Sequence, residues 1–248
     1  MQQIYSLEFS VHTYEVDYNN RIKVSAIFNF MQEVAIEHAR LLHSTYEELM
    51  DRGLYWVLVR ARLELTGIPM INDKVRLETW LKGKNKLYYQ REYLIYNAQN
   101  KIIGQATTDW VIINATTKHL QRKNIFEEES KYYLDKQAVK QSLFKIEDIS
   151  IKELAYFREV RYSELDINCH VNNTRYIDWI MDAFDQNFHT NKNLKSLQVN
   201  YKHQSKWGEK VKILKGQTKT DNFYVEGITE ESGYKVFEAI VEWECAHS

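Results

Sequence analysis

Three polar residues of different chemistry stand at alternate positions in one short segment. In "ELDINCHVNNTRYIDWI", residues 164–180, Asp166, Asn168 and His170 come directly before a helix-like apolar pattern. Alternate positions of an extended segment project to one side. A carboxylate can take a proton from water or attack directly, and an imidazole can donate or accept a proton near neutral pH. With the N–H groups of a helix N-terminus to stabilise an oxyanion, this set predicts attack on an acyl carbonyl.

Two metal-binding interpretations of the segment fail. An EF-hand loop needs Gly at its sixth position and an acidic residue at its twelfth, and both positions are apolar here. Zinc takes three or four ligands, and only Asp166 and His170 are suitable locally. A structural interpretation remains, in which Asp and Asn form turns and Asn172 or Asn173 caps the following helix. The presence of His170 favours the catalytic interpretation.

A similar segment occurs near the start of the chain. Sliding the sequence on itself aligns Asp17 with Asp166 and Asn19 with Asn168, and "GQATTDWVI" matches "FEAIVEWEC" at the ends of the two parts. Agreement at both ends, in the same order, predicts a duplicated chain. Arg21 stands where the second copy has His170, so the two copies are not expected to form equivalent sites.

The elements that must position these residues follow from hydrophobic periodicity. An apolar stripe repeats close to every 3.6 residues in the first copy and predicts a helix. The stripe consists of Val24, Ile27, Phe28, Met31, Ala35 and Leu42. Residues 237–245 alternate apolar and acidic side chains, which predicts a strand with one buried face after a turn at 230–233.

A second, shorter helix is predicted only in the first copy. Ser44 and Glu47 have the spacing of a capping box, and Gly53 stands where a C-cap is expected. Each copy thus contains a strand, a helix and then several antiparallel strands, which is an α+β arrangement. We expect the halves to be residues 1–128 and 153–248, joined by a charged connector at 129–152.

Bulk properties limit the class of protein. The 248 residues are 44% hydrophobic and 27% charged, which indicates a globular chain. The net charge of −1 makes no general case for nucleic acid. No apolar stretch approaches the roughly 18 residues that span a bilayer. Two cysteines and a start without signal-peptide character predict a cytoplasmic protein with no disulfide framework.

The segment "LDINCHVNNTRYIDWI" resembles the active-site signature of the acyl–acyl carrier protein (acyl-ACP) thioesterases. The likeness continues in "YEVDYNNRIKVSAIFNFMQEVA", "LYWVLVRARLEL" and "GQATTDWVIIN", and it covers nearly the whole chain. It implies a tandem (double) hotdog fold, in which each half wraps a curved antiparallel sheet around a long central helix. It also implies a hydrolase of fatty acid biosynthesis that releases free fatty acid and holo-ACP. The partner would be acyl carrier protein, and no metal or organic cofactor is expected.

The resemblance also implies roles for individual residues. It gives Asp166, Asn168 and His170 as catalytic, whereas the first half, with Arg21 in the histidine position, would hold the acyl chain. Plant members carry a Glu-Cys pair downstream, and this chain has Gln204 and Ser205 there. A cysteine nucleophile at that position is therefore excluded.

Carboxylate chemistry is favoured in its place. Asp166 would act as general base to water, or attack directly to give a transient mixed anhydride. Gln204 is a candidate for positioning the water. Ser205 is a weaker candidate, because a serine hydroxyl without an adjacent base is unreactive.

Three alternatives stay open from the sequence. The chain could be an acyl-coenzyme A thioesterase, a dehydratase or other hotdog lyase, or a non-catalytic acyl-binding protein. The oligomeric state is also open, because fused halves can form a monomeric pseudo-dimer or pair again as a homodimer.

Overall fold

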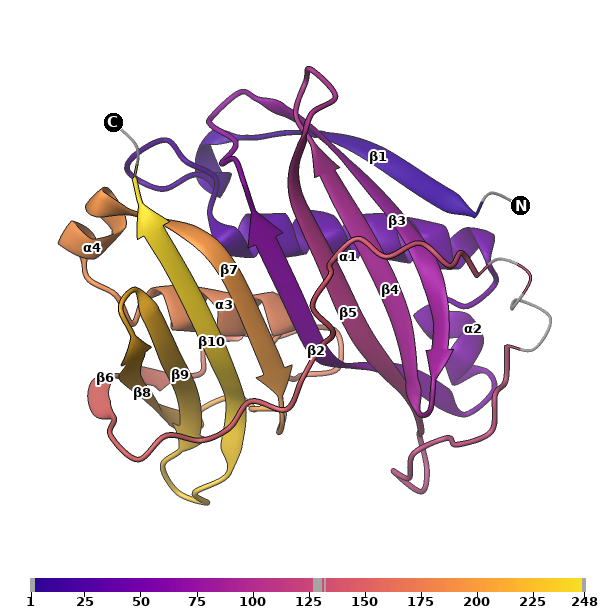
Figure 1. Ribbon diagram of the computed structural model, residues 1–248. Helices are drawn as coiled ribbons and strands as arrows, with labels where there is room; N and C mark the ends of the chain where they lie inside the picture. The colour runs from indigo at the N-terminus through magenta and orange to yellow at the C-terminus, as the bar shows by residue number, and fades with distance from the viewer. Residues whose placement is uncertain (1–2, 127–130, 132, 247–248) are drawn as a thin grey trace.

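One antiparallel sheet of ten strands runs through the whole molecule (Figure 1). The computed structural model describes residues 3–126, 131 and 133–246. From one edge to the other the strand order is β1-β3-β4-β5-β2-β7-β10-β9-β8-β6. The second half of this order repeats the first half in reverse, and β2 and β7 pair antiparallel at the centre. The duplication expected from the sequence is therefore confirmed.

The strands of the two halves correspond one to one. The first half contains β1 (Ile4–Ser10), β2 (Leu54–Leu65), β3 (Lys74–Asn85), β4 (Tyr88–Tyr96) and β5 (Ile102–Asn114). The second half contains β6 (Glu153–Glu159), β7 (Lys192–Tyr201), β8 (Lys210–Lys219), β9 (Asn222–Thr229) and β10 (Lys235–Cys245). A 3-10 turn follows the first strand of each half, η1 (Thr13–Glu15) after β1 and η3 (Tyr162–Glu164) after β6.

The helices α1 (Val24–Leu41) and α3 (Asn173–Met181) lie on one face of the curved sheet (Figure 1). They lie side by side and contact each other. The predicted stripe of α1 is buried at Ile27, Phe28, Met31 and Ala35, where it packs into the main core. This arrangement confirms the tandem hotdog fold. None of the described helices is long and apolar enough to cross a membrane.

The two central helices differ in length. Helix α1 has 18 residues and α3 has 9. The chain leaves α3 after Met181, and Asp185 then begins α4 (Gln186–Asn191) by accepting a hydrogen bond from the backbone N–H of Phe188 at 2.7 Å. The expectation of a long central helix in each half therefore holds for the first half only.

The second helix of the first half begins one residue later than expected. Helix α2 spans Tyr46–Met50, and its capping box is formed by Thr45 and Glu48. Ser44 is buried instead, and its carbonyl accepts a hydrogen bond from the Trp56 indole at 3.0 Å. Gly53 has the positive φ of +67° expected near the helix end, and its N–H donates to the carbonyl of Met50 at 2.8 Å.

The segment 133–152, which leads into β6, crosses the sheet on the face opposite the helices (Figure 1). Buried polar side chains of the sheet bind its backbone. Glu92 accepts a hydrogen bond from the N–H of Ala138 at 2.7 Å, and the Gln198 amide donates to the carbonyl of Phe144 at 2.8 Å. The expected boundary at 128–129 lies outside the described residues.

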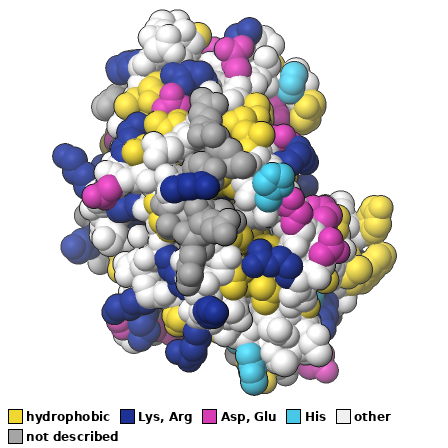
Figure 2. Space-filling view, turned by 90° about the vertical axis from the view of Figure 1, so that its right-hand side faces the viewer, with side chains coloured by type: hydrophobic (Ala, Val, Ile, Leu, Met, Phe, Trp, Pro, Cys, Tyr) yellow, Lys and Arg dark blue, Asp and Glu magenta, His cyan; other side chains and the backbone are white. Residues whose placement is uncertain are grey.

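The end of the molecule formed by the first half carries side chains of mixed character. Figure 2 shows basic, acidic and apolar side chains interspersed on this face.

Candidate active site

Asp166 closes a tight loop between η3 and α3. Its backbone N–H donates to the carbonyl of His170 at 2.7 Å. Its Oδ1 accepts the N–H groups of Asn168 at 2.8 Å and His170 at 3.2 Å, and Cys169 has a positive φ of +60°. The prediction that residues 166–170 are extended, which is based on the alternating polar residues, is therefore wrong. A carboxylate that accepts two nearby N–H groups stabilises a turn instead.

The loop around Asp17 in the first half has the same backbone geometry. The Asp17 Oδ1 accepts the N–H of Asn19 at 2.7 Å and of Arg21 at 3.0 Å, and its own N–H donates to the Arg21 carbonyl at 2.8 Å. Asn20 has a φ of +61°, matching Cys169. The aspartate thus organises the backbone in both halves, and only the surrounding side chains distinguish the two loops.

The first difference lies at the position of Arg21 and His170. The Arg21 guanidinium pairs with Asp17 at 3.3 Å and donates to Asn193 Oδ1 at 2.8 Å and to the carbonyl of His189. A bound guanidinium therefore fills the first-half site. In the second half, Nδ1 of His170 is buried without a hydrogen-bond partner among the described residues. The second loop keeps an imidazole with an uncommitted nitrogen.

The second difference lies in the segment that faces each loop. The N–H of Val171 donates to the carbonyl of Ser205 at 2.9 Å, and the corresponding bond in the first half joins Ile22 to Pro69 at 2.9 Å. Ser205 thus takes the place of Pro69. Gln204 before it is exposed, whereas an apolar residue precedes Pro69. At these two positions the second half has polar residues where the first half has Ile68 and Pro69.

Ser205 contacts a buried tyrosine of α3. Its N–H donates to the Tyr176 hydroxyl at 3.0 Å. Burial raises the pKa of Tyr176 to about 12, so this phenol stays protonated at neutral pH. The Ser205 hydroxyl is fully buried near the phenol, close enough to lower its pKa, but among the described residues it has no partner in hydrogen-bonding geometry. No base therefore holds Ser205 ready for attack.

Helix α3 begins directly after the loop, with Asn172 as its N-cap. The side chain of Asn172 accepts the N–H of Thr174 at 2.9 Å, as expected for one of the two candidate caps. The cap occupies one of the N–H groups that the sequence suggested for an oxyanion. The positive end of the helix dipole still lies beside the loop.

The first half contributes one further residue that the sequence did not suggest. The hydroxyl of Tyr46, at the start of α2, donates to Oδ1 of Asn168 at 2.6 Å. Residue 46 lies far from the motif in sequence, and no local pattern marks it. Only the packing of the two halves brings these side chains together.

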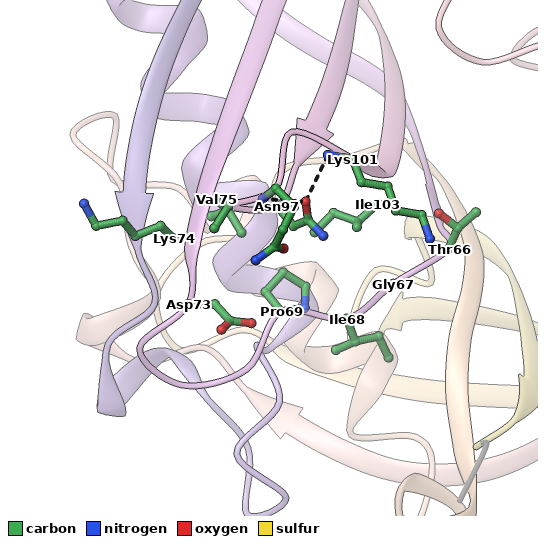
Figure 3. A pocket seen from close by; sticks show the side chains of 12 residues that line it. Thr66, Gly67, Ile68, Pro69, Asp73, Lys74, Val75, Asn97, Lys101 and Ile103 are labelled. Atoms are coloured by element: carbon green, nitrogen blue, oxygen red, sulfur yellow. Dashed lines mark hydrogen bonds between the residues drawn. The ribbon is translucent and has the colours of Figure 1, made fainter.

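A cavity of about 310 Å³ lies in the first half, away from the Asp166 loop (Figure 3). Its walls come from residues 66–69, 73–75, 97–99, 101 and 103, and they include Pro69 of the segment that faces the first loop. Figure 3 shows Asp73, Lys74, Asn97 and Lys101 among the side chains around it. These polar walls do not favour an apolar chain, and residues 166–170 do not line the cavity.

Comparison with known families matches both halves of the chain. Residues 2–131 match the model of the acyl-ACP thioesterase N-terminal domain, and residues 146–245 match that of the acyl-ACP thioesterase C-terminal domain.

Two plant proteins are among the curated relatives. A chloroplastic palmitoyl-acyl carrier protein thioesterase of Gossypium hirsutum is 27% identical over 214 residues, covering 81% of this chain and 52% of the relative. An oleoyl-acyl carrier protein thioesterase 2 of Arabidopsis thaliana is 27% identical over 253 residues, covering 92% and 67%. The chain spans about half the length of the first of these relatives.

Solved structures share the fold over almost the full chain. An acyl-ACP thioesterase from Bacteroides thetaiotaomicron superposes with a TM-score of 0.90 at 25% identity and covers 98% of both chains. The 12:0-ACP thioesterase of Umbellularia californica superposes with a TM-score of 0.86 at 22% identity, covering 99% of both chains, and supports the fold.

Proposed function

This chain belongs to the acyl-ACP thioesterase family, and on that premise we propose that it hydrolyses fatty acyl-ACP to free fatty acid and holo-ACP. The observation that carries the proposal is the asymmetry of two otherwise equal loops. Both have an aspartate-closed backbone, but only the second combines it with a histidine nitrogen left without a partner. A duplicated fold with one chemically equipped loop is expected to hold one reaction centre.

The proposed chemistry centres on the carboxylate of Asp166. Its Oδ1 is held by two backbone N–H groups, which leaves Oδ2 to react. It takes a proton from water as the water adds to the carbonyl carbon, or attacks that carbon itself to give a mixed anhydride that water then cleaves. His170 gives a proton to the departing thiolate and regains one that originates from the attacking water, so the imidazole returns to its starting state. Asn168 binds the carbonyl oxygen, and the exposed Gln204 is a candidate for holding the water.

We assign the acyl chain to the first half, residues 1–128, and the chemistry to residues 153–248, with 129–152 as connector. Two features support this division. Arg21 fills the loop that would otherwise be a second reaction centre. Helix α1 presents a long apolar face to the sheet, where an acyl tail finds apolar neighbours.

The partner in this proposal is acyl carrier protein in the cytoplasm. The two cysteines are unpaired, in keeping with a reducing compartment. Pairing of β2 with β7 completes the sheet within one chain, which supports a monomeric pseudo-dimer. A homodimer built on the outer surface is the second possibility.

The deciding experiment compares carriers. Purified protein is assayed with one acyl chain attached to acyl carrier protein and, separately, to coenzyme A. We expect the higher kcat/KM on acyl carrier protein, with free fatty acid as product. A preference for coenzyme A would make the chain an acyl-coenzyme A thioesterase. An unsaturated thioester product would indicate a lyase, and binding without turnover an acyl-binding protein.

A further inference from the structure

A tyrosine of the first half is hydrogen-bonded to the amide of the second-half motif. The hydroxyl of Tyr46 donates to Oδ1 of Asn168 at 2.6 Å, a short bond for two neutral groups. The backbone N–H of Asn168 donates to Asp166 at 2.8 Å. Asn168 is thus held at its backbone by its own half and at its side chain by the other half.

The helix that carries Tyr46 is firmly attached to the first half. Thr45 and Glu48 form the capping box at its start. The N–H of Glu48 donates to the Thr45 hydroxyl at 3.3 Å, and the N–H of Thr45 donates to the Glu48 carboxylate at 2.9 Å. Leu49 is fully buried in a second apolar core together with Tyr89 and Phe126. A tyrosine on such an anchored helix can fix the rotamer of a partner at little additional entropic cost.

We propose that Tyr46 is a positioning residue that makes Asn168 a hydrogen-bond donor to the thioester carbonyl; this inference rests on the proposed hydrolysis. A carboxamide has one accepting end and one donating end. Tyr46 occupies the accepting end, so the Nδ2 hydrogens are the ones left for substrate. A donor aimed at the carbonyl oxygen strengthens its hydrogen bond as negative charge develops there.

A tyrosine in the Asp17 loop of the first half also forms a hydrogen bond to the other half, but it does not bind a motif amide. The hydroxyl of Tyr18, in the Asp17 loop, donates to the backbone carbonyl of Gln186 at 2.7 Å, at the start of α4. No motif amide takes part in that bond. Tyr18 is therefore a matched control, since its hydroxyl forms an inter-half hydrogen bond of similar length that should matter for stability alone.

The kinetic experiment uses Tyr46→Phe, Tyr18→Phe, Asn168→Ala and the double variant Tyr46→Phe/Asn168→Ala. Tyr46→Phe should lower kcat about three- to tenfold with KM little changed, which is the effect of one neutral hydrogen bond. Tyr18→Phe should keep the kcat of the unaltered protein. In the Asn168→Ala background, Tyr46→Phe should cost nothing further, because its target is gone. Wild-type kcat in Tyr46→Phe, or full additivity in the double variant, would overturn the inference.

A second measurement does not depend on turnover. The side-chain amide resonances of Asn168 are identified in a ¹⁵N–¹H spectrum by their absence in Asn168→Ala. They should move in Tyr46→Phe and stay in place in Tyr18→Phe. Unmoved resonances in Tyr46→Phe would refute the positioning role. Absence of thioester hydrolysis by the unaltered protein would instead refute the proposed function, while the spectrum still decides the hydrogen bond.

Discussion

At the scale of residues, Asp166 has a structural role in its loop and a proposed chemical role. The duplicated loop at Asp17 has the structural role alone, so the two roles can be tested separately. Asp166 and Asp17 each accept two backbone N–H groups through Oδ1, so each stabilises its loop. Only Asp166 shares its loop with a histidine. A loss of activity at Asp166 therefore has to be compared with the same change at Asp17 before it is assigned to chemistry.

This comparison gives a prediction for Asp166→Asn and Asp17→Asn. Asparagine keeps an oxygen for the two N–H groups but loses the charge, so both variants should fold and both should melt at a lower temperature. Turnover should fall at least about 100-fold in Asp166→Asn, the range expected when a general base is lost, and stay near normal in Asp17→Asn. Steady-state kinetics with melting curves would measure both effects. Equal activities in the two variants would exclude a chemical role for Asp166.

At the scale of elements, ion pairs hold the connector where it enters β6. The buried Glu226 on β9 binds Lys152 at 2.5 Å and Lys235 at 2.8 Å. Burial alone would raise the pKa of Glu226, but the hydrogen bonds from Lys152, Lys235 and Tyr224, together with the charge of Lys235, lower that pKa overall. Asp148 of the connector binds the same lysines at 2.7 and 3.2 Å, and the Lys152 hydrogen bond lowers its pKa to about 2.

This cluster predicts a pH-dependent effect of Asp148→Asn. A carboxyl group whose pKa is lower in the folded state stabilises the protein above its unfolded pKa of about 4 and loses that effect as the pH falls through about 2. The variant should melt below the unaltered protein at pH 7, and the difference should narrow below about pH 4. Glu8→Gln, in an exposed pair with Lys74, should leave the melting temperature unchanged. A difference that persists unchanged at acid pH would contradict the assignment.

At the scale of the whole molecule, the halves are joined by more than the pairing of β2 with β7. Arg21 reaches from the first loop to the start of β7, where it donates to Asn193 Oδ1 at 2.8 Å and to the carbonyl of Lys192 at 3.3 Å. Its side chain is 15% exposed, so these bonds are largely shielded from water. Arg21, which stands in the first half where the second half has His170, thus links the two halves by hydrogen bonds.

Removal of the Arg21 side chain should lower the free energy of unfolding and leave kcat unchanged. Arg21→Ala leaves several shielded acceptors without a donor, and we expect a loss of about 2–4 kcal/mol in the free energy of unfolding. Arg40→Ala, which removes a mostly exposed pair with Glu37, should cost well under about 1 kcal/mol. Denaturant titration would measure both, and kcat should stay near normal. A collapse of kcat in Arg21→Ala as deep as that in Asp166→Asn would argue against a single reaction centre.

The sequence by itself determined the duplication, the strand and helix types, the family and several local signals. The turn at 230–233 joins β9 to β10, with Gly233 at a φ of +69°, and Asn172 caps α3. Such features depend on residues close together in the chain, so periodicity and turn chemistry are enough to predict them. The sequence predicts the capping box of α2 one residue early, because Ser44 with Glu47 and Thr45 with Glu48 have the same spacing; in the folded chain Ser44 is buried and Thr45 forms the cap.

Only the tertiary structure decided what surrounds the motif. The closed loop at Asp166 itself is local, since the carboxylate binds N–H groups two and four residues further along the chain, and it agrees with the turn interpretation of the sequence. The remote contacts of the loop are not local. The bond from Tyr46 to Asn168 and the bonds from Arg21 to the second half join residues that are remote in sequence. No local pattern encodes such pairs, since they exist only after two folded halves pack against each other.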